Sequence, residues 1–372
     1  MYRIDSNTGA ILNQTILPNS GATQEIVGTP CVYNGVVYVA TRSGMLFALN
    51  AANLDVLPWS YTCLENETIR GSPIAYNNVV YFGTSAPQGG SRGIDPYTGG
   101  GRLHAISIAT QKDLTGTNPG MVAATKYYVM YASPSVDVDT NRAYIGDSSC
   151  YVTAIDRSTG AWKYEWFPNE SEVFNASIPV LDGYLFQGSN GSFVWRIKDS
   201  GSSLSSDADG EIFFPTTGSV NSTPAAYNHR LYICDSGGMV YCALANGDTF
   251  KGDPDIKIWE TALPSSIVSS PALSIPTGML FVATSDAKIY ALDITTGTIK
   301  WQYDIRALDS RPNATIKSSP AISRGGLYIV VDDSSKRYLY CFKDQEAHSP
   351  IPNPTPIKKI KVPKEPLPKR KY

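Results

Sequence analysis

The chain has 372 residues, of which 42% are hydrophobic and 17% charged, and its formal net charge is −2. So few charges argue against an array of long solvated helices, and the sequence contains neither a run of 18 apolar residues nor a signal peptide, so no transmembrane segment is expected. Residues 349–372 carry six Lys and one Arg against one Glu, a charge of +6, which leaves −8 for the rest and argues against nucleic-acid binding there.

A repeated unit accounts for most of the chain. Its clearest copy, Ser269–Tyr303, reads SSPALSIPTGMLFVATSDAKIYALDITTGTIKWQY: three short apolar runs, each followed by a tight turn, and a fourth run with Trp. This pattern predicts a four-stranded antiparallel sheet. A Pro marks each copy, at Pro30, Pro73, Pro134, Pro179, Pro224, Pro271 and Pro320, and all but Pro179 directly follow a small polar residue. Most marks lie 43 to 49 residues apart, which predicts an all-β fold, a β-propeller of seven blades.

The two ends of the chain complement each other. The N-terminal residues YRIDSNTGAIL match YALDITTGTIK of the clearest copy, so they correspond to the end of a third strand and a fourth strand, whereas the last copy stops after its third. We therefore predict that a strand at about residues 10–16 completes the last blade beside Tyr338–Phe342 and closes the ring. An eight-bladed ring lacking most of its first blade stays open as an alternative, because Tyr2–Asp5 resemble a third-strand remnant.

The propeller is predicted to span residues 1–344. Its first six blades are expected at Gly28 to about Tyr61, Gly71 to about Tyr131, Ala132–Phe167, Ala176 to about Phe214, Asn221–Thr261 and Val268–Ile305. The short turns all fall on one face of the ring, and the long segments 85–101, 113–126, 200–220 and 306–316 are expected mostly on the other. Variable length on one face of a rigid scaffold is typical of a binding surface.

Residues 345–372 form a separate Pro- and Lys-rich tail. Seven Pro between residues 349 and 372 argue against a helix or an inner strand and favour an extended conformation. The tail could be a linker to a further domain, a basic arm for a polyanionic surface, or a strap that mediates self-assembly with a neighbouring subunit. The candidate contact residues are Lys358, Lys359, Lys361, Lys369, Arg370 and Lys371.

The sequence offers few groups for chemistry. The six cysteines have no CxxC or metal-ligand spacing, and His104 occupies a third-strand position that other copies fill with Phe or Tyr. We therefore predict no catalytic residue, no cofactor and no metal site. Candidate partner-binding residues in the insertion of the second blade are Arg92, Asp95, Tyr97 and Arg102, which could equally belong to a solvated loop.

One motif identifies a family. Residues 291–301 read ALDITTGTIKW, and this resembles the AxDxxTGxxxW motif of quinoprotein-type (PQQ-like) β-propeller repeats. In that family Ala291, Asp293, Thr296, Gly297 and Trp301 are expected to be structural, with Asp and Thr capping the turn and Trp between blades. The sequence lacks the adjacent cysteine pair and ligand set of the quinone-dependent dehydrogenases, so it fits better the BamB-like branch, which serves as a noncatalytic docking platform.

The predicted function is a noncatalytic scaffold for protein–protein interaction or assembly, which binds through the long-loop face with the basic tail as an extra contact. A PQQ-dependent oxidoreductase and a carbohydrate-binding surface protein are the alternatives. The resemblance favours an extracellular, cell-surface or periplasmic location, with the cytoplasm as the other option.

Overall fold

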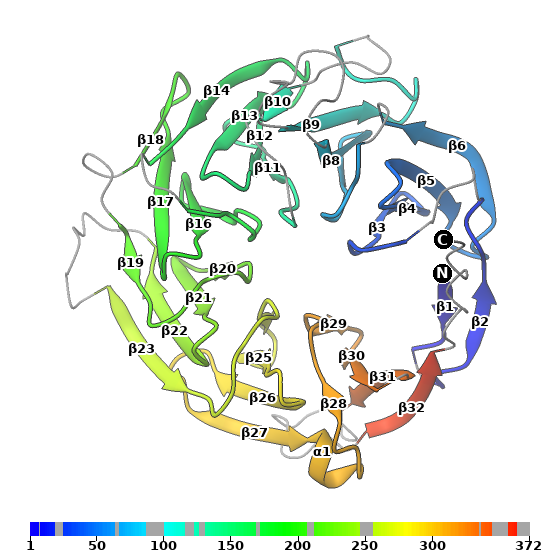
Figure 1. The fold of residues 1–372 in the computed structure, drawn as a ribbon, viewed down its shortest axis with the longest axis vertical. Helices are drawn as coiled ribbons and strands as arrows, with labels where there is room; N and C mark the ends of the chain where they lie inside the picture. Colours follow the sequence, from blue (N-terminus) through cyan, green and yellow to red (C-terminus); the bar gives the residue numbers. More distant parts are fainter. Residues whose placement is uncertain are drawn as a thin grey trace, which may run out of the picture.

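The computed structural model describes residues 1–6, 8–18, 25–63, 67–86, 100–115, 123–125, 131–168, 172–206, 212–245, 256–334, 336–343 and 356–362. In this part of the chain seven antiparallel blades stand around a ring, and α1 (Ile305–Leu308) is the one helix (Figure 1). The prediction of a seven-bladed β-propeller is confirmed. No helix among the described residues is long and apolar enough to cross a membrane.

The strands of each blade follow one another in the sheet. Blade 1 has β3 (Cys31–Tyr33), β4 (Val36–Ala40), β5 (Met45–Asn50) and β6 (Val56–Thr62); blade 2 has β7 (Ile74–Tyr76), β8 (Val79–Ala86), β9 (Gly100–Ser107) and β10 (Ala123–Thr125). Blade 3 has β11 (Ser135–Asp137), β12 (Arg142–Gly146), β13 (Val152–Asp156) and β14 (Trp162–Trp166); blade 4 has β15 (Val180–Leu181), β16 (Tyr184–Gly188), β17 (Phe193–Asp199) and β18 (Leu204–Ser206), with β19 (Phe214–Pro215) on β17.

The remaining blades continue this order. Blade 5 has β20 (Ala225–Tyr227), β21 (Arg230–Cys234), β22 (Met239–Leu244) and β23 (Lys257–Ala262); blade 6 has β24 (Ala272–Ser274), β25 (Met279–Ala283), β26 (Lys288–Asp293) and β27 (Ile299–Asp304). Blade 7 has β29 (Ala321–Ser323), β30 (Gly326–Asp333), β31 (Lys336–Lys343) and β32 (Pro356–Val362), with β28 (Ala314–Thr315) on β30.

The N-terminal strands form a two-stranded sheet of their own at the junction between blades 7 and 1 (Figure 1). Here β1 (Tyr2–Ile4) pairs with β2 (Ile11–Gln14), and the Tyr328 hydroxyl donates a hydrogen bond to the Ser6 carbonyl oxygen at 3.3 Å. This corrects the expected pairing of residues 10–16 with the last blade, because β31 pairs instead with β32. β2 and β31 each pair with a strand that is near them in the sequence, β1 and β32 respectively. Closing a short loop costs less entropy than closing one across the whole chain.

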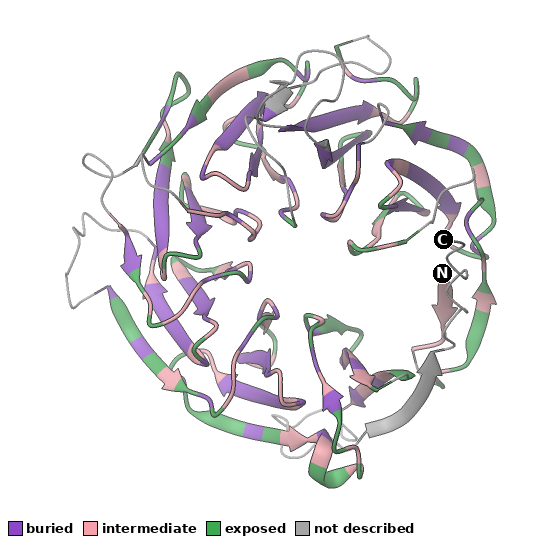
Figure 2. Cartoon of the chain, in the orientation of Figure 1, coloured by how far each residue is buried: buried purple, intermediate pink, exposed green. Residues whose placement is uncertain are grey.

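The hydrophobic core is divided into layers between neighbouring blades (Figure 2). Because side chains alternate across a strand, each blade contributes one row of apolar residues to the layer before it and one to the layer after. Phe281 and Ala291 of blade 6, for example, pack with Leu327 and Phe342 of blade 7. Blades 2 to 6 therefore each depend on both of their neighbours.

A small polar residue directly before each Pro, or two positions before it in blade 4, also links the blades. Its backbone N–H donates a hydrogen bond to the side-chain oxygen of the matching residue in the next blade, at 2.8 to 3.0 Å. The series runs through Thr29, Ser72, Ser133, Ser177, Thr223, Ser270 and Ser319. These bonds explain why the small polar residue recurs in each copy, because its side-chain hydroxyl accepts a hydrogen bond from a backbone N–H that has no strand carbonyl as its partner.

Candidate functional site

The repeat motif around Asp293 forms the turn between the third and fourth strands of blade 6. Asp293 Oδ1 accepts hydrogen bonds from the backbone N–H of Thr295 at 2.8 Å and of Thr296 at 3.1 Å, and Gly297 has a φ of +72°. Trp301 is buried opposite Ala291 in the sheet and packs edge-on against Phe342 of blade 7. All five motif residues thus build the blade and its packing.

The same motif in blade 3 shows how such a turn acts on its carboxylate. Burial raises the pKa of Asp156, but hydrogen bonds from Ser158 and Thr159 outweigh it and lower the pKa to about 2. Donors that bind the charged form stabilise it, so the carboxylate stays ionised at neutral pH.

The four candidate partner-binding residues of blade 2 do not share one loop. Arg92, Asp95 and Tyr97 lie outside the described residues. Arg102 lies in β9 and is 1% exposed, with its guanidinium paired to the Glu67 carboxylate between blades 1 and 2. Arg102 is therefore part of the interior of the ring in this structure.

The tail residues divide in a similar way. Lys358, Lys359 and Lys361 lie in β32, opposite Cys341, Tyr340 and Tyr338 of β31. Lys369, Arg370 and Lys371 lie outside the described residues. Part of the tail is thus the outermost strand of blade 7, a place where its leading Pro356 is tolerated because an edge strand needs no outward donor.

The two faces of the ring differ in the segments they carry. We call the face with the strand 1–2 and 3–4 turns the hairpin face, and the face with the strand 2–3 turns and the blade-to-blade connections the connection face. The end of β8 and the start of β9 lie at the connection face, as does the segment with α1. Residues 113–126 were expected there too, but their described part includes β10, the fourth strand of blade 2, which pairs with β9.

Apolar side chains are exposed in most of the described blade-to-blade connections. Tyr131 is 51% exposed before blade 3, Val268 46% before blade 6 and Leu308 64% in α1. Others on the same face are Ile16, Val27 and Phe167. Side chains of this type in water favour contact with another apolar surface.

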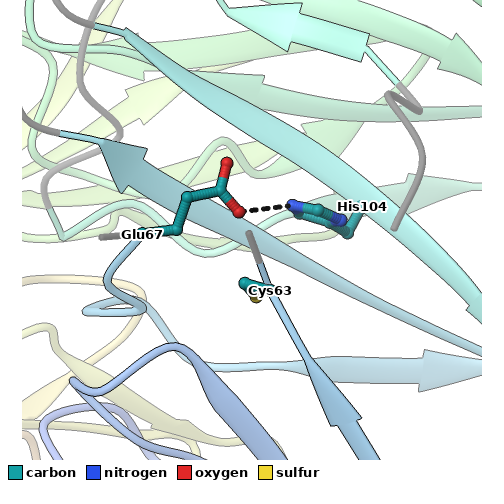
Figure 3. A group of neighbouring side chains, drawn as sticks. All are labelled: Cys63, Glu67 and His104. Atoms are coloured by element: carbon teal, nitrogen blue, oxygen red, sulfur yellow. Dashed lines mark ion pairs between the residues drawn. The ribbon is translucent and has the colours of Figure 1, made fainter. Parts of the chain in front are cut away.

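A polar cluster that the sequence did not predict lies between blades 1 and 2. Cys63 directly follows β6, Glu67 lies on the connection to blade 2, and His104 lies in β9 (Figure 3). Arg102 and His104 are two residues apart in β9, so both side chains face blade 1. Tyr61 and Asp113 complete the group.

Three neighbouring side chains surround the imidazole of His104. Its ring stacks on Phe82 with centroids 4.7 Å apart and planes 6° apart. Nε2 lies 3.7 Å from Glu67 Oε2, and Nδ1 lies 3.6 Å from Asp113 Oδ1. The Tyr61 hydroxyl donates a hydrogen bond of 2.9 Å to the other oxygen of Asp113, which fixes that carboxylate in turn.

Burial determines the electrostatics of the cluster. Desolvation, followed by the Asp113 carboxylate, raises the pKa of both the Tyr61 hydroxyl and the Cys63 thiol. Desolvation also lowers the pKa of Arg102. The thiol is therefore neutral here, and the cluster holds two carboxylates near one guanidinium in a space too dry for a substrate to enter.

Sequence reasoning missed this cluster because its members come from two blades. Cys63 and Glu67 are 41 and 37 residues before His104 in the chain, across the expected start of a new blade. One signal was present: Arg and His stand in a third strand where other copies carry apolar residues. Two polar residues on one face of a buried strand require polar partners across the interface.

Comparison with known proteins finds one matching family model, which covers most of the chain. The family model described as outer membrane protein assembly factor BamB matches residues 1–118 and 184–339. The structure is similar to that of BamB from Moraxella catarrhalis, with 16% identity, a TM-score of 0.61, and 92% of this chain and 88% of that one covered. No curated protein has a sequence that matches this chain.

The fold is also similar to that of two enzymes. The quinohemoprotein alcohol dehydrogenase from Comamonas testosteroni has 14% identity and a TM-score of 0.59, with 92% of this chain and 67% of that one covered. A europium-containing methanol dehydrogenase has 15% identity and a TM-score of 0.51, with 85% and 72% covered. At such identities the likeness shows a shared fold and does not carry function.

Proposed function

The chain belongs to the BamB family of quinoprotein-type repeat propellers, and from that premise we propose that it is a noncatalytic scaffold which binds a protein partner through its connection face. The proposal rests on one observation above all: apolar side chains of that face, among them Tyr131, Val268 and Leu308, are exposed in the links between blades. They are attached to a rigid ring, so a partner would bind a preformed surface.

The chemistry of the described residues supports the same conclusion. The densest group of ionisable side chains, around Glu67 and His104, is buried between blades and is not open to a substrate. The exposed Tyr131 is the type of residue that anchors a protein interface, where a few aromatic side chains carry much of the binding energy.

The basic tail is proposed as a second contact. Since β32 ends at Val362, the residues available for such a contact without disturbing the blade are Lys369, Arg370 and Lys371. Their charge suits an acidic partner surface and would act mainly on the rate of association.

Affinity capture from the native source tests the proposal with matched variants. The connection-face variant carries Tyr131→Asp, Val268→Asp and Leu308→Asp, and the control carries Val138→Asp, Tyr227→Asp and Ile275→Asp, which are exposed on the hairpin face. We expect a partner that the parent captures to be kept by the control and lost by the connection-face variant. Equal capture by both variants would exclude the connection face.

A truncation tests the tail separately. The chain should be shortened after Val362, because a cut after Asp344 would also remove β32 and change blade 7 itself. Weaker capture with slower association, lost at high salt, is expected if the tail contacts the partner. Unchanged association would limit recognition to the propeller.

A quinone-dependent oxidoreductase is the second candidate, favoured by the likeness of the fold to two dehydrogenases. Adding pyrroloquinoline quinone and calcium to the full chain with an alcohol and a redox dye distinguishes the two. The scaffold proposal expects no dye reduction above the quinone alone. Turnover that saturates with alcohol would establish the enzyme.

A further inference from the structure

We propose that Cys63, Glu67 and His104 bind one divalent ion of the zinc class between blades 1 and 2. The inference does not depend on the scaffold function, because the three residues are buried between blades 1 and 2 and none of the exposed side chains proposed to contact a partner belongs to the cluster. It would give the chain a metal that fastens two neighbouring blades.

The ligand atoms already converge. One Cys sulfur, one carboxylate oxygen and one imidazole nitrogen lie within 4.8 Å of one another, and the Nε2–Oε2 pair is 3.7 Å apart. Ligands around a tetrahedral zinc ion, with bonds of about 2.0 to 2.3 Å, lie about 3.3 to 3.8 Å from each other. Small side-chain movements therefore suffice to bring the three ligand atoms to this spacing.

The thiol of Cys63 points to a ligand independently of the acidic groups. The residue is 7% exposed, and among the described residues its sulfur makes no hydrogen bond. A buried thiol is common by itself, but one whose sulfur lies within 4.8 Å of a carboxylate oxygen and an imidazole nitrogen provides the donor set that a zinc ion uses.

Each ligand that needs orientation has an outer partner. Asp113 Oδ1 lies 3.6 Å from Nδ1 of His104, whereas Nε2 faces Glu67 Oε2 at 3.7 Å and the Thr84 hydroxyl at 3.4 Å. Arg102 pairs with one oxygen of Glu67 and leaves the other toward His104. Metal-binding histidines usually donate their second ring N–H to a carboxylate, and ligating carboxylates are themselves held by donors.

The charges also favour a divalent ion. The two carboxylates of Glu67 and Asp113 stand against the one guanidinium of Arg102. A divalent cation that binds Cys63 as the thiolate would add positive charge where carboxylates are in excess. Sulfur and imidazole ligands select zinc-class ions over calcium or magnesium, which prefer oxygen.

Refolding the full, tag-free chain with Co²⁺ or Zn²⁺, followed by removal of free metal, tests the proposal, because a buried site exchanges metal slowly. We expect one equivalent by metal analysis and, with Co²⁺, the sulfur-to-cobalt charge-transfer absorption that requires a thiolate ligand. Zn²⁺ should also raise the Tm, since an ion that binds only the folded state stabilises it.

Three variants separate this site from casual binding. Cys63→Ser should abolish the charge-transfer band and weaken binding at least tenfold, whereas Cys234→Ser, which alters another buried cysteine, should change neither. The outer-shell change Asp113→Asn should keep the band and weaken binding about 10- to 100-fold. No stoichiometric metal in the refolded parent, or a band that survives Cys63→Ser in a folded variant, would overturn the proposal.

Discussion

The substitution Arg102→Leu removes the guanidinium that pairs with Glu67 between blades 1 and 2 while keeping an apolar side chain in β9. Both side chains of this pair are 1% exposed, so the remaining carboxylate cannot recover its hydration without opening the interface. Breaking a buried pair by removing one partner costs about 3 to 5 kcal/mol, because a charge is left uncompensated in a poorly polar space.

The expected loss in the free energy of unfolding can be converted into a decrease in Tm. For 372 residues the entropy of unfolding is about 0.8 kcal/mol/K, taking about 2.1 cal/mol/K per residue. A loss of about 3 to 5 kcal/mol then lowers the Tm by about 4 to 6 °C if the ring unfolds as a unit. Differential scanning calorimetry of the full chain without added metal measures this shift.

A second ion pair supplies the control. Arg42 and Glu25 are joined at 3.0 Å but are 48% and 52% exposed, so Arg42→Leu should cost less than about 1 kcal/mol and shift the Tm by about 1 °C at most. The double variant Arg102→Leu with Glu67→Gln should recover part of the loss, because it removes the stranded charge. Equal shifts for Arg102→Leu and Arg42→Leu would refute the burial argument.

Three further changes test other parts of the fold. Truncation after Lys343 should lower the Tm clearly more than truncation after Val362, because only the first removes β32 and exposes the edge of β31; equal values would mean that β32 does not stabilise blade 7. Gly297→Ala should destabilise the chain by about 1 to 3 kcal/mol more than Gly278→Ala, as judged by urea unfolding, since both have positive φ but only at Gly297 would a Cβ approach Trp259, to 2.5 Å. Asp156→Asn should cost about 1 kcal/mol at pH 6 after allowance for solvent screening, and because the folded pKa of about 2 lies below the usual 3.8, the difference should shrink as the pH falls from about 4 toward 2; a difference independent of pH would contradict the pKa argument.

The blades could be predicted because each one repeats the same local information. Turn residues such as Asp293 and Gly297 act within a few residues, and the period of the marks determines the architecture. Closure of the ring could not be predicted in this way, because it depends on whether β31 pairs with a strand from the N-terminus or with one from the tail. A tail with seven Pro argued against an inner strand, and β32 satisfies that limit as an edge strand that starts at Pro356 and ends before Pro363.

The candidate site was less accessible to sequence reasoning. Arg102 stands at the end of an insertion rich in Gly, and only the register of β9 against β8 shows that its side chain lies inside the ring. The group around His104 required knowing which face of β9 meets blade 1 and where Glu67 crosses to blade 2. Contacts between blades follow from strand register and packing, and these are tertiary properties that no local motif encodes.

The N-terminal pair β1–β2 lies at the junction between blades 7 and 1 and has only two strands, whereas each blade has at least four. On the face of blade 7 that points toward it, Tyr328, Val330, Leu339 and Cys341 are half-buried, whereas Phe281, Ala283, Ile289 and Ala291, their counterparts in blade 6, are fully buried. A ring with one weak seam has the thermodynamics of a linear stack with two ends, in which terminal units open before central ones. Amide exchange should therefore be fastest in blade 7 and slowest in blades 3 to 5. Although the ring is closed, its unfolding would then begin at a defined place.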